Sequence, residues 1–168
     1  MQRFAYFPLD TPVGRLGILC DDTFIIRLLF PSDNLERELQ RLKGECDSHC
    51  DTEASRLARH FADELNEYFA GRRKRFTVAP ALVGTRFERA VWGGILRFPY
   101  GETVSYSRMA AMCGVHGAQA VGRVVGLNPV PILVPCHRVV RQDGSLGGYR
   151  GGPAVKARLL ALERNRED

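Results

Sequence analysis

The chain has 168 residues, of which 45% are hydrophobic and 26% are charged, and its formal net charge is +5. These proportions are ordinary for a globular protein, and this length allows one domain or two small ones without disulfides. No apolar run approaches the roughly 18 residues of a membrane span, and the segment MQRFAYFPLD lacks the layout of a signal peptide. We therefore expect no membrane partner, a cytoplasmic location (nuclear if the source is eukaryotic) and free thiols at the five cysteines.

Charge is distributed unevenly along the chain. Residues 1–80 contain 12 Lys or Arg against 13 Asp or Glu, whereas residues 81–168 contain 12 against 6, and Lys156 is the only lysine of that half. Arginine suits phosphate because its planar guanidinium matches phosphate oxygens in a bidentate arrangement. A basic half beside a neutral half indicates a module that binds a polyanion; the alternative is an arginine-rich surface without such a partner.

The first half predicts a sheet with two helices. Short apolar runs between residues 4 and 30 indicate two or three strands, separated by turn residues at 10–12 and 21–22. A helix capped at Ser32 or Asp33 is expected to present one apolar face, made of Leu35, Leu39 and Leu42. A longer helix ending at Gly71 is expected to do the same with Leu57, Phe61, Leu65 and Phe69. A charge run and a proline follow, so we place a domain boundary near Pro80.

The second half predicts mostly helices. The segment TRFERAVWGGILRFP has an apolar stripe at helical spacing, formed by Phe87, Val91, Ile95 and Phe98. Two shorter helices follow, one capped near Ser105 and ended by Gly114, the other covering AQAVGRVVGL and ending before Asn128. Two short helices joined by a glycine-containing turn in a basic region are typical of a helix-turn-helix, although many helical hairpins bind nothing. A last helix begins at Pro153.

A thiol, an imidazole and a guanidinium follow one another in NPVPILVPCHRVV. Residues 130–134 have the composition of a covered strand, although Pro131 lacks an amide donor and favours an edge or irregular segment. A buried free cysteine is usually inert. A reactive one needs a base or a positive charge nearby, because an ordinary thiol with a pKa of ~8.5 is mostly protonated at neutral pH. His137 and Arg138 could serve Cys136, although strand neighbours point to opposite faces, so His137 would need a bend or a bridging water.

Other segments carry weaker signals. The segment CDSHC places Cys46, His49 and Cys50 like half of a zinc site, but no second half follows, so we do not expect a metal there. The glycine-rich RQDGSLGGYRGG predicts a hairpin turn at residues 143–144 and allows close backbone approach to a ligand, as does any tight surface loop. Glu163, in the last helix, has the pattern of an ordinary solvated residue.

The segments NPVPILVPCHR and GSLGGYRGG together resemble the active-site region of the O6-alkylguanine-DNA alkyltransferases, the methylated-DNA–protein-cysteine methyltransferases. The similarity extends from FERAVWGGILRFPYGETVSYSRMA through AVKARLLALE, whereas the first half is similar only in the order of its elements. The resemblance implies an α/β (α+β) fold of two domains. Residues 1–80 would form a ribonuclease-H-like α/β domain, and residues 81–168 a mostly helical domain with a winged-helix-like helix-turn-helix.

The function that the resemblance implies is direct-reversal DNA repair by a suicide enzyme, without cofactor or metal. Cys136 would displace guanine from the alkyl group of O6-alkylguanine and would keep that group irreversibly. His137 would act as base through a water, oriented by Glu163, and Tyr106 would donate a hydrogen bond to the departing guanine. Which alkyl groups are accepted, and whether O4-alkylthymine is a substrate, stays open.

The resemblance also implies how DNA is bound. The second helix of the helix-turn-helix would enter the minor groove of double-stranded DNA, and the damaged nucleotide would be flipped out. We expect a monomer, with cooperative binding along DNA left open. The DNA-binding and hinge residues would be Ser105, Gln119, Arg123 and Asn128, and the alkyl pocket would consist of Pro131, Val134, Tyr149 and Arg150. Gln119 departs from the family pattern, which has arginine there, so we expect weaker binding or slower flipping.

Three other functions are weighed against this one. A non-catalytic protein that senses alkyl lesions would share the fold, but such proteins generally lack the nucleophilic cysteine that stands here at Cys136. A cysteine hydrolase using Cys136 and His137 would leave the helix-turn-helix and the basic half without a role. A transcription factor would leave Cys136 without a role.

Overall fold

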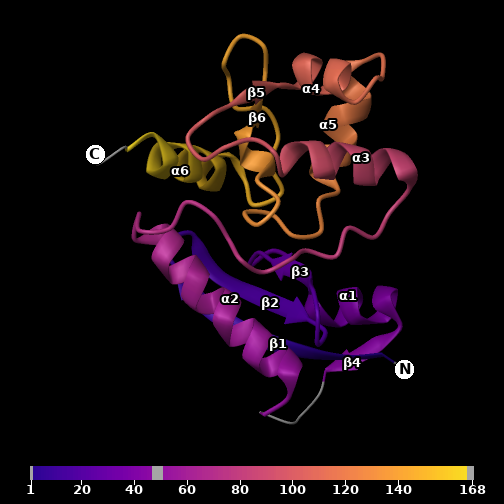
Figure 1. The fold of residues 1–168 in the computed structure, drawn as a ribbon, viewed down its shortest axis with the longest axis vertical. Coiled ribbons are helices and arrows are strands. Elements are labelled where there is room, and N and C mark those ends of the chain that lie inside the picture. Colours follow the sequence, from indigo (N-terminus) through magenta and orange to yellow (C-terminus); the bar gives the residue numbers. More distant parts are fainter. Residues whose placement is uncertain (1, 47–50, 166–168) are drawn as a thin grey trace. The chain divides into compact units, whose positions relative to one another are not determined.

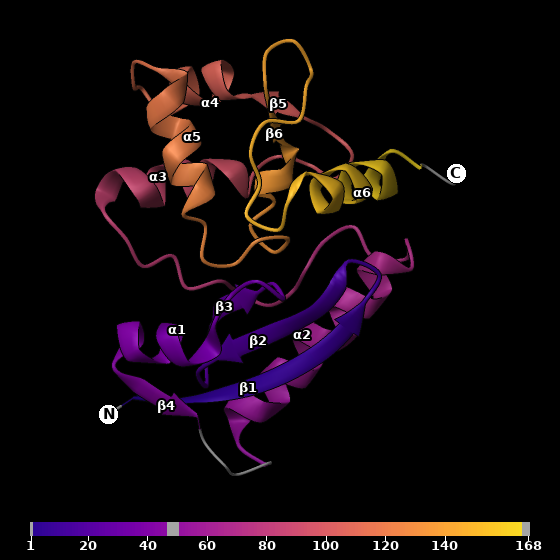
Figure 2. The same ribbon diagram turned by 180° about the vertical axis from the view of Figure 1, so that it is seen from behind.

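The computed structural model describes residues 2–46 and 51–165, and the chain divides into two compact units between Ala81 and Leu82 (Figures 1 and 2). The first unit is a sheet with helices, and the second is mostly helical, as expected. Within the described ranges, no helix combines the length and the apolar character needed to cross a bilayer.

The first unit is built on a four-stranded sheet in the order β3-β2-β1-β4. Its strands are β1 (Gln2–Thr11), β2 (Gly14–Cys20), β3 (Ile25–Leu29) and β4 (Gly44–Cys46). β2 pairs antiparallel with both β1 and β3, and β4 pairs parallel with β1. The first three strands confirm the predicted runs. The short β4 was not predicted, since GEC carries no strand pattern.

Two helices cover opposite faces of this sheet. Alternate side chains of a strand point to opposite sides, and the neighbours Leu19 and Cys20 of β2 accordingly contact different helices. α1 (Leu35–Leu42) packs its three leucines against a cluster formed by Phe4, Leu19 and Ile26, as its spacing predicted. Its cap is Asn34, whose side chain accepts from the Arg37 amide at 2.8 Å, and not the predicted Ser32 or Asp33. On the other face, the Cys20 thiol donates to the Ala54 carbonyl of α2 (Glu53–Phe69) at 3.0 Å.

The buried face of α2 is rotated from the predicted one. Phe61 and Leu65 are buried as expected, but Leu57 and Phe69 are only half-buried, and Ala58 and Tyr68 take their places in the core. Three alanines, Ala54, Ala58 and Ala62, share the buried face, and a prediction based on the spacing of the large apolar residues did not include them.

The second unit surrounds a separate hydrophobic core. Its elements are α3 (Arg86–Ile95), β5 (Val104–Ser105), α4 (Tyr106–Met112), α5 (Ala118–Gly126), the 3-10 turn η1 (Cys136–Arg138), β6 (Val139–Val140) and α6 (Pro153–Arg164). α3 begins with a capping box between Thr85 and Glu88. Trp92 is buried, and its indole nitrogen donates to the Val124 carbonyl at 3.0 Å, which fixes α3 to α5.

The predicted helical hairpin is formed by α4 and α5. The Ser105 side chain caps α4 by accepting from the Arg108 amide at 3.1 Å. Gly114 and Gly117, with φ of 68° and 110°, supply the left-handed backbone that the connection requires. α5 buries Val121, Val124 and Val125 and leaves its opposite side exposed.

Residues 130–134 do not form the covered strand that their composition predicted. They make a buried turn in which the Val134 amide donates to the Val130 carbonyl at 2.9 Å, with Ile132 at φ 73°. A β-branched residue in the left-handed region is a strained conformation. Prolines at positions 129, 131 and 135 remove the donors that a strand needs, so the irregular alternative indicated by Pro131 holds.

Candidate active site

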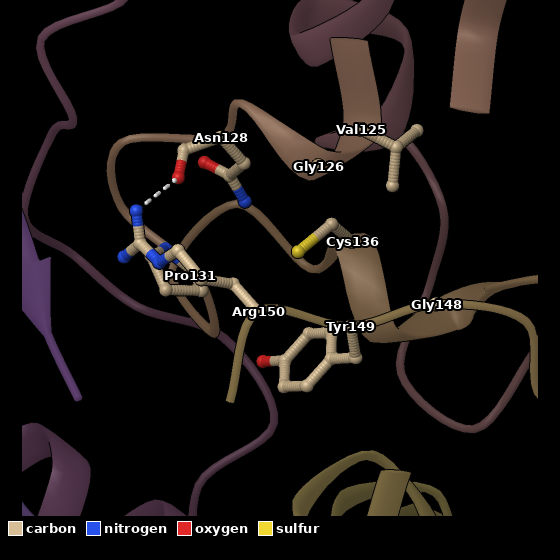
Figure 3. Close-up of a pocket in the computed structure, with 8 residues that line it drawn as sticks. All are labelled: Val125, Gly126, Asn128, Pro131, Cys136, Gly148, Tyr149 and Arg150. Carbon is tan, nitrogen blue, oxygen red and sulfur yellow. Dashed lines mark hydrogen bonds between the residues drawn. The ribbon is translucent and has the colours of Figure 1, made fainter. Parts of the chain in front are cut away.

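Cys136 lies in the wall of a small pocket in the second unit (Figure 3). The pocket has an empty volume of about 250 Å³, open solvent at its mouth included. The thiol-bearing residue is itself only 4% exposed. The other lining residues come from the end of α5, the turn that follows it and the glycine-rich loop: Val125, Gly126, Asn128, Pro131, Gly148, Tyr149 and Arg150.

The next residue, His137, is completely buried and is paired with Glu163 of α6. Its Nε2 lies 2.6 Å from Oε1 of Glu163. Among the described residues, its other ring nitrogen, Nδ1, has no hydrogen-bond partner. Burial lowers the pKa of His137, although the hydrogen bond and charge of Glu163 act in the opposite direction. A neutral imidazole whose Nε2 carries the proton therefore leaves the Nδ1 lone pair available as a base.

Glu163 is held as a carboxylate despite being 1% exposed. Burial acts to raise its pKa, but hydrogen bonds and charges from His137 and Arg138 prevail and lower it to about 2. Arg138 donates from Nε at 2.8 Å and from Nη2 at 3.0 Å, and the Gly101 amide donates at 3.2 Å. An ionised Glu163 can only accept from His137, and this fixes the tautomer of the imidazole.

Asn128 connects α5 to the cysteine. Its Nδ2 donates to the Val134 carbonyl at 2.8 Å, and its Oδ1 accepts from the Val130 amide at 3.0 Å. The same Val134 carbonyl accepts from the Cys136 amide at 2.7 Å. Asn128 is 3% exposed, so both ends of its amide are used inside the protein. This side chain holds the strained turn in place and thereby positions the thiol relative to the end of α5.

The thiol of Cys136 is neutral in the resting protein. Burial raises its pKa, and this effect exceeds the lowering by the hydrogen bond of Asn128 and by the positive charges of Arg150 and Lys156. A buried thiolate would form only when a base takes the proton and these groups stabilise the charge. The site therefore combines an inert resting thiol with the groups needed to activate it.

Lys156 is a buried cation that the sequence did not point to. It is 0% exposed, and its Nζ donates to the Val139 carbonyl at 2.6 Å and lies 5.7 Å from the ring centroid of Tyr106. Burial lowers its pKa to about 8, while Cys136 acts to raise it. Lys156 stands three residues after Pro153 in a helix without a local signal, and only its burial and its hydrogen bond to the Val139 carbonyl of β6 reveal it.

Five of the predicted site residues line the pocket. Cys136, Asn128, Pro131, Tyr149 and Arg150 share the pocket. Val134 is not among the lining residues; it lies in the hydrophobic core and contributes its carbonyl.

The remaining ones stand apart from the pocket wall. Tyr106, at the start of α4, is half-buried. Its pKa is raised mainly by burial and to a smaller extent by the charge of Cys136. Gln119 and Arg123 are exposed on α5, and Ser105 acts as the cap of α4. In the first unit, Cys46 is exposed on β4, and its expected neighbours His49 and Cys50 lie outside the described residues. In the described ranges, no three His, Cys, Asp or Glu side chains are grouped so as to hold a metal.

The second unit combines a helix-turn-helix with a buried thiol that directly precedes a buried histidine–carboxylate pair, an arrangement typical of a protein that joins a nucleophilic cysteine to a DNA-binding fold. The chain belongs to the 6-O-methylguanine DNA methyltransferase family. Residues 4–81 match the ribonuclease-like domain of that family, and residues 86–165 match its DNA-binding domain.

Relatives and a solved structure agree with this membership. A methylated-DNA–protein-cysteine methyltransferase of Mycobacterium bovis is 38% identical over 96% of this chain and 93% of its own length. An inducible one of Bacillus subtilis is 49% identical over 62% of this chain and 59% of its own length, so the chain spans less than two thirds of that relative. The OGT protein of Mycobacterium tuberculosis, crystallised in complex with DNA, superimposes with a TM-score of 0.81 at 36% identity, covering 98% of this chain and 94% of that one.

Proposed function

We propose that this protein repairs DNA by transferring the alkyl group of O6-alkylguanine to Cys136, once and irreversibly. The observation that carries the proposal is the placement of Cys136 in a pocket wall directly before the buried His137–Glu163 pair. Family membership supports the same reaction, because relatives are named for transfer of methyl from DNA to a protein cysteine. In this proposal, site and nucleophile belong to a domain of residues 81–168, and residues 1–80 form the other domain.

The reaction moves one proton and one alkyl group. His137 accepts the thiol proton at Nδ1, through a bridging water, while Glu163 stabilises the imidazolium that forms. The Cys136 thiolate attacks the alkyl carbon, so that the carbon–sulfur bond forms as the carbon–O6 bond breaks. The electron pair of that bond goes to the guanine, which ends protonated, and the net proton thus passes from thiol to guanine. The thioether is a poor leaving group, so the protein is used once.

Charge that develops on the departing guanine is met by polar groups at the site. Tyr106 donates a hydrogen bond to the base, and its raised pKa keeps the phenol protonated and able to donate. The positive charges of Arg150 and Lys156 stabilise the thiolate before attack. Pro131, Tyr149 and Arg150 contact the alkyl group in the pocket, with Val134 behind them.

Double-stranded DNA reaches the site by flipping of the damaged nucleotide. A stacked guanine hides its O6 substituent, and its extrusion costs a few kcal/mol, which phosphate contacts of the basic unit offset. α5 enters the minor groove with Gln119 and Arg123, which are exposed, and the end of this helix leads directly to Asn128 and the pocket. The protein binds as a monomer and works in the cytoplasm, or in the nucleus of a eukaryote.

Transfer from a duplex that carries O6-[³H]methylguanine tests the proposal. The wild type should take up labelled methyl until one methyl group is bound per protein molecule. Cys136→Ser should take up none and should still bind the duplex. Cys113→Ser, which changes a half-buried thiol of the same unit, is the matched control and should react like the wild type. Lesion-selective binding without uptake by the wild type would favour the non-catalytic sensor instead.

A further inference from the structure

Arg141 stands at the end of the two-stranded ladder that frames the site. β5 and β6 pair in parallel, with Val104 opposite Val139 and Ser105 opposite Val140. Extending this register by one residue places Arg141 beside Tyr106, the phenol assigned to the departing base. The pairing therefore brings the backbone of Arg141 close to Tyr106, although 35 positions separate the two residues in the sequence, and the charge of Arg141 acts on the Tyr106 phenol.

The loop that starts at Arg141 leads back to the pocket. It is closed by two backbone hydrogen bonds, from the Arg141 amide to the Ser145 carbonyl and from the Gly144 amide to the Arg141 carbonyl, both 2.9 Å. Farther along, the backbone of Gly147 lies against the phenol of Tyr106, since a Cβ there would be 2.9 Å from its oxygen. Gly148 then lines the pocket. Arg141 is thus tied to a loop whose other end forms the pocket wall.

The guanidinium of Arg141 is exposed, and among the described residues it makes no hydrogen bond or ion pair. The nearest acid on the loop, Asp143, is engaged with Ser145, accepting from its amide at 2.9 Å and from its hydroxyl at 2.6 Å. The groups that face Arg141 from other elements are the Tyr106 phenol and the Lys156 ammonium, whose pKa values it acts to lower. The charge of Arg141 also acts to lower the pKa of Asp143, but among the described residues no hydrogen bond or ion pair holds its guanidinium.

We propose that Arg141 binds a backbone phosphate adjoining the flipped nucleotide and so holds the damaged base in the pocket. When a base enters, its sugar and phosphates stay outside, so a cation at the rim meets them. Arginine suits this contact because it can hold two phosphate oxygens at once. The inference rests on the proposed function, and it adds a positioning residue that acts on the DNA backbone and leaves the reacting atoms to Cys136 and His137.

The test compares two substrates that differ in having phosphates. Single-turnover transfer is measured from a duplex containing O6-methylguanine and from the free base O6-benzylguanine, for the wild type, Arg141→Gln and Arg141→Lys. Arg158→Gln is the matched control, because Arg158 is also exposed and unpaired in the described part of this unit but lies on α6. Duplex affinity is measured in parallel by fluorescence anisotropy at several salt concentrations.

We expect Arg141→Gln to slow transfer from the duplex roughly tenfold and to leave the free-base reaction unchanged. Its slope of log affinity against log salt should fall by about one, while Arg141→Lys should recover most of the rate. Equal duplex rates for Arg141→Gln and Arg158→Gln would overturn the inference, and so would equal slowing on both substrates, which indicates a structural role. If the wild type transferred nothing, the proposed function would fail, and the anisotropy arm would still decide whether Arg141 contacts phosphate.

Discussion

Each unit buries a glutamate beside an arginine and a histidine. The difference between the two clusters shows which features belong to a structural ion pair and which belong to a candidate active site. In the first unit, Glu64 is 1% exposed and binds Arg73 at 3.0 Å and the Thr77 amide at 2.9 Å, with His60 at 3.7 Å. In the second unit, Glu163 is equally buried and binds Arg138 and His137 at 2.8 and 2.6 Å.

The histidines behave differently. The side chain of His60 is 56% exposed, and its ring nitrogen is 3.0 Å from the Thr77 hydroxyl on the surface. His137 is buried, follows the pocket cysteine and keeps one ring nitrogen without a partner among the described residues. Glu64 accordingly fastens the segment around Thr77 to α2, whereas Glu163 fixes a base beside a nucleophile. A buried carboxylate–arginine pair therefore has only a structural role in the first unit, whereas in the second unit the same kind of pair also contacts a buried base that adjoins a thiol.

The largest expected difference between the two clusters is in the transfer rate after the charge of Glu163 or of Glu64 is removed. Glu163→Gln frees the imidazole from its fixed tautomer and should slow transfer about 100-fold, because orienting partners of a base carry effects of this size. Glu64→Gln should leave the transfer rate per folded molecule unchanged and lower the free energy of unfolding by about 1–3 kcal/mol. Single-turnover transfer and urea unfolding followed by circular dichroism measure both.

The pH profile of Glu163→Gln shows whether Glu163 acts through His137 or only supports the fold. A positioning role predicts that the pH at half-maximal transfer shifts in Glu163→Gln and stays at the wild-type value in Glu64→Gln. If the two variants lost transfer to the same extent, the distinction between the clusters would be wrong.

Acid should next weaken the second unit through Glu163. Its folded pKa of about 2 lies below the ordinary 4.5, so the folded state binds fewer protons than the unfolded state in this range. The stabilisation is complete above pH 4.5 and is lost as pH falls towards 2, with a size on the order of 3 kcal/mol. Trp92, the only tryptophan, reports on this unit by fluorescence. A Glu163→Gln protein with the same acid dependence as the wild type would disprove the assignment.

The smallest expected change in transfer rate comes from a substitution on the exposed face of α5. Gln119→Arg adds a charge where the helix meets the vacated base and should raise the rate on duplex about 3- to 10-fold, since hydrogen bonds to charged groups exceed neutral ones. The free-base rate should not change, because Gln119 is exposed and does not line the pocket. An unchanged duplex rate would show that Gln119 does not limit binding or flipping.

Much of the fold was readable from local patterns. Several features can be recognised from residues within one or two helical turns of one another. They are the three leucines of α1, the apolar stripe of α3, the Ser105 cap and Pro153 at the start of α6. Cys136 and His137 were identified as candidates because their residue types are adjacent in the chain. The roles of Glu163 and Tyr106 came only from the family resemblance, since neither has a local signal.

What the sequence did not predict depends on contacts between distant segments. Residues 130–134 have strand composition, but their prolines and the hydrogen bonds of Asn128 impose a turn, which the period of the apolar residues cannot reveal. Lys156 and Glu64 look like surface residues in their helices, and only tertiary partners keep them buried. Cys136–Arg138 is a 3-10 turn, so the alternation of side chains along a strand does not apply to His137, and the chain makes the bend that the prediction allowed for.

Intact-protein mass spectrometry after mixing equimolar protein with an O6-methylguanine duplex, followed by peptide mapping, tests the central claim most directly. The account predicts one added methyl group per protein, located on Cys136, with no second addition when the duplex is in excess. Methyl on another residue, more than one per protein, or lesion-selective binding with no adduct would contradict it.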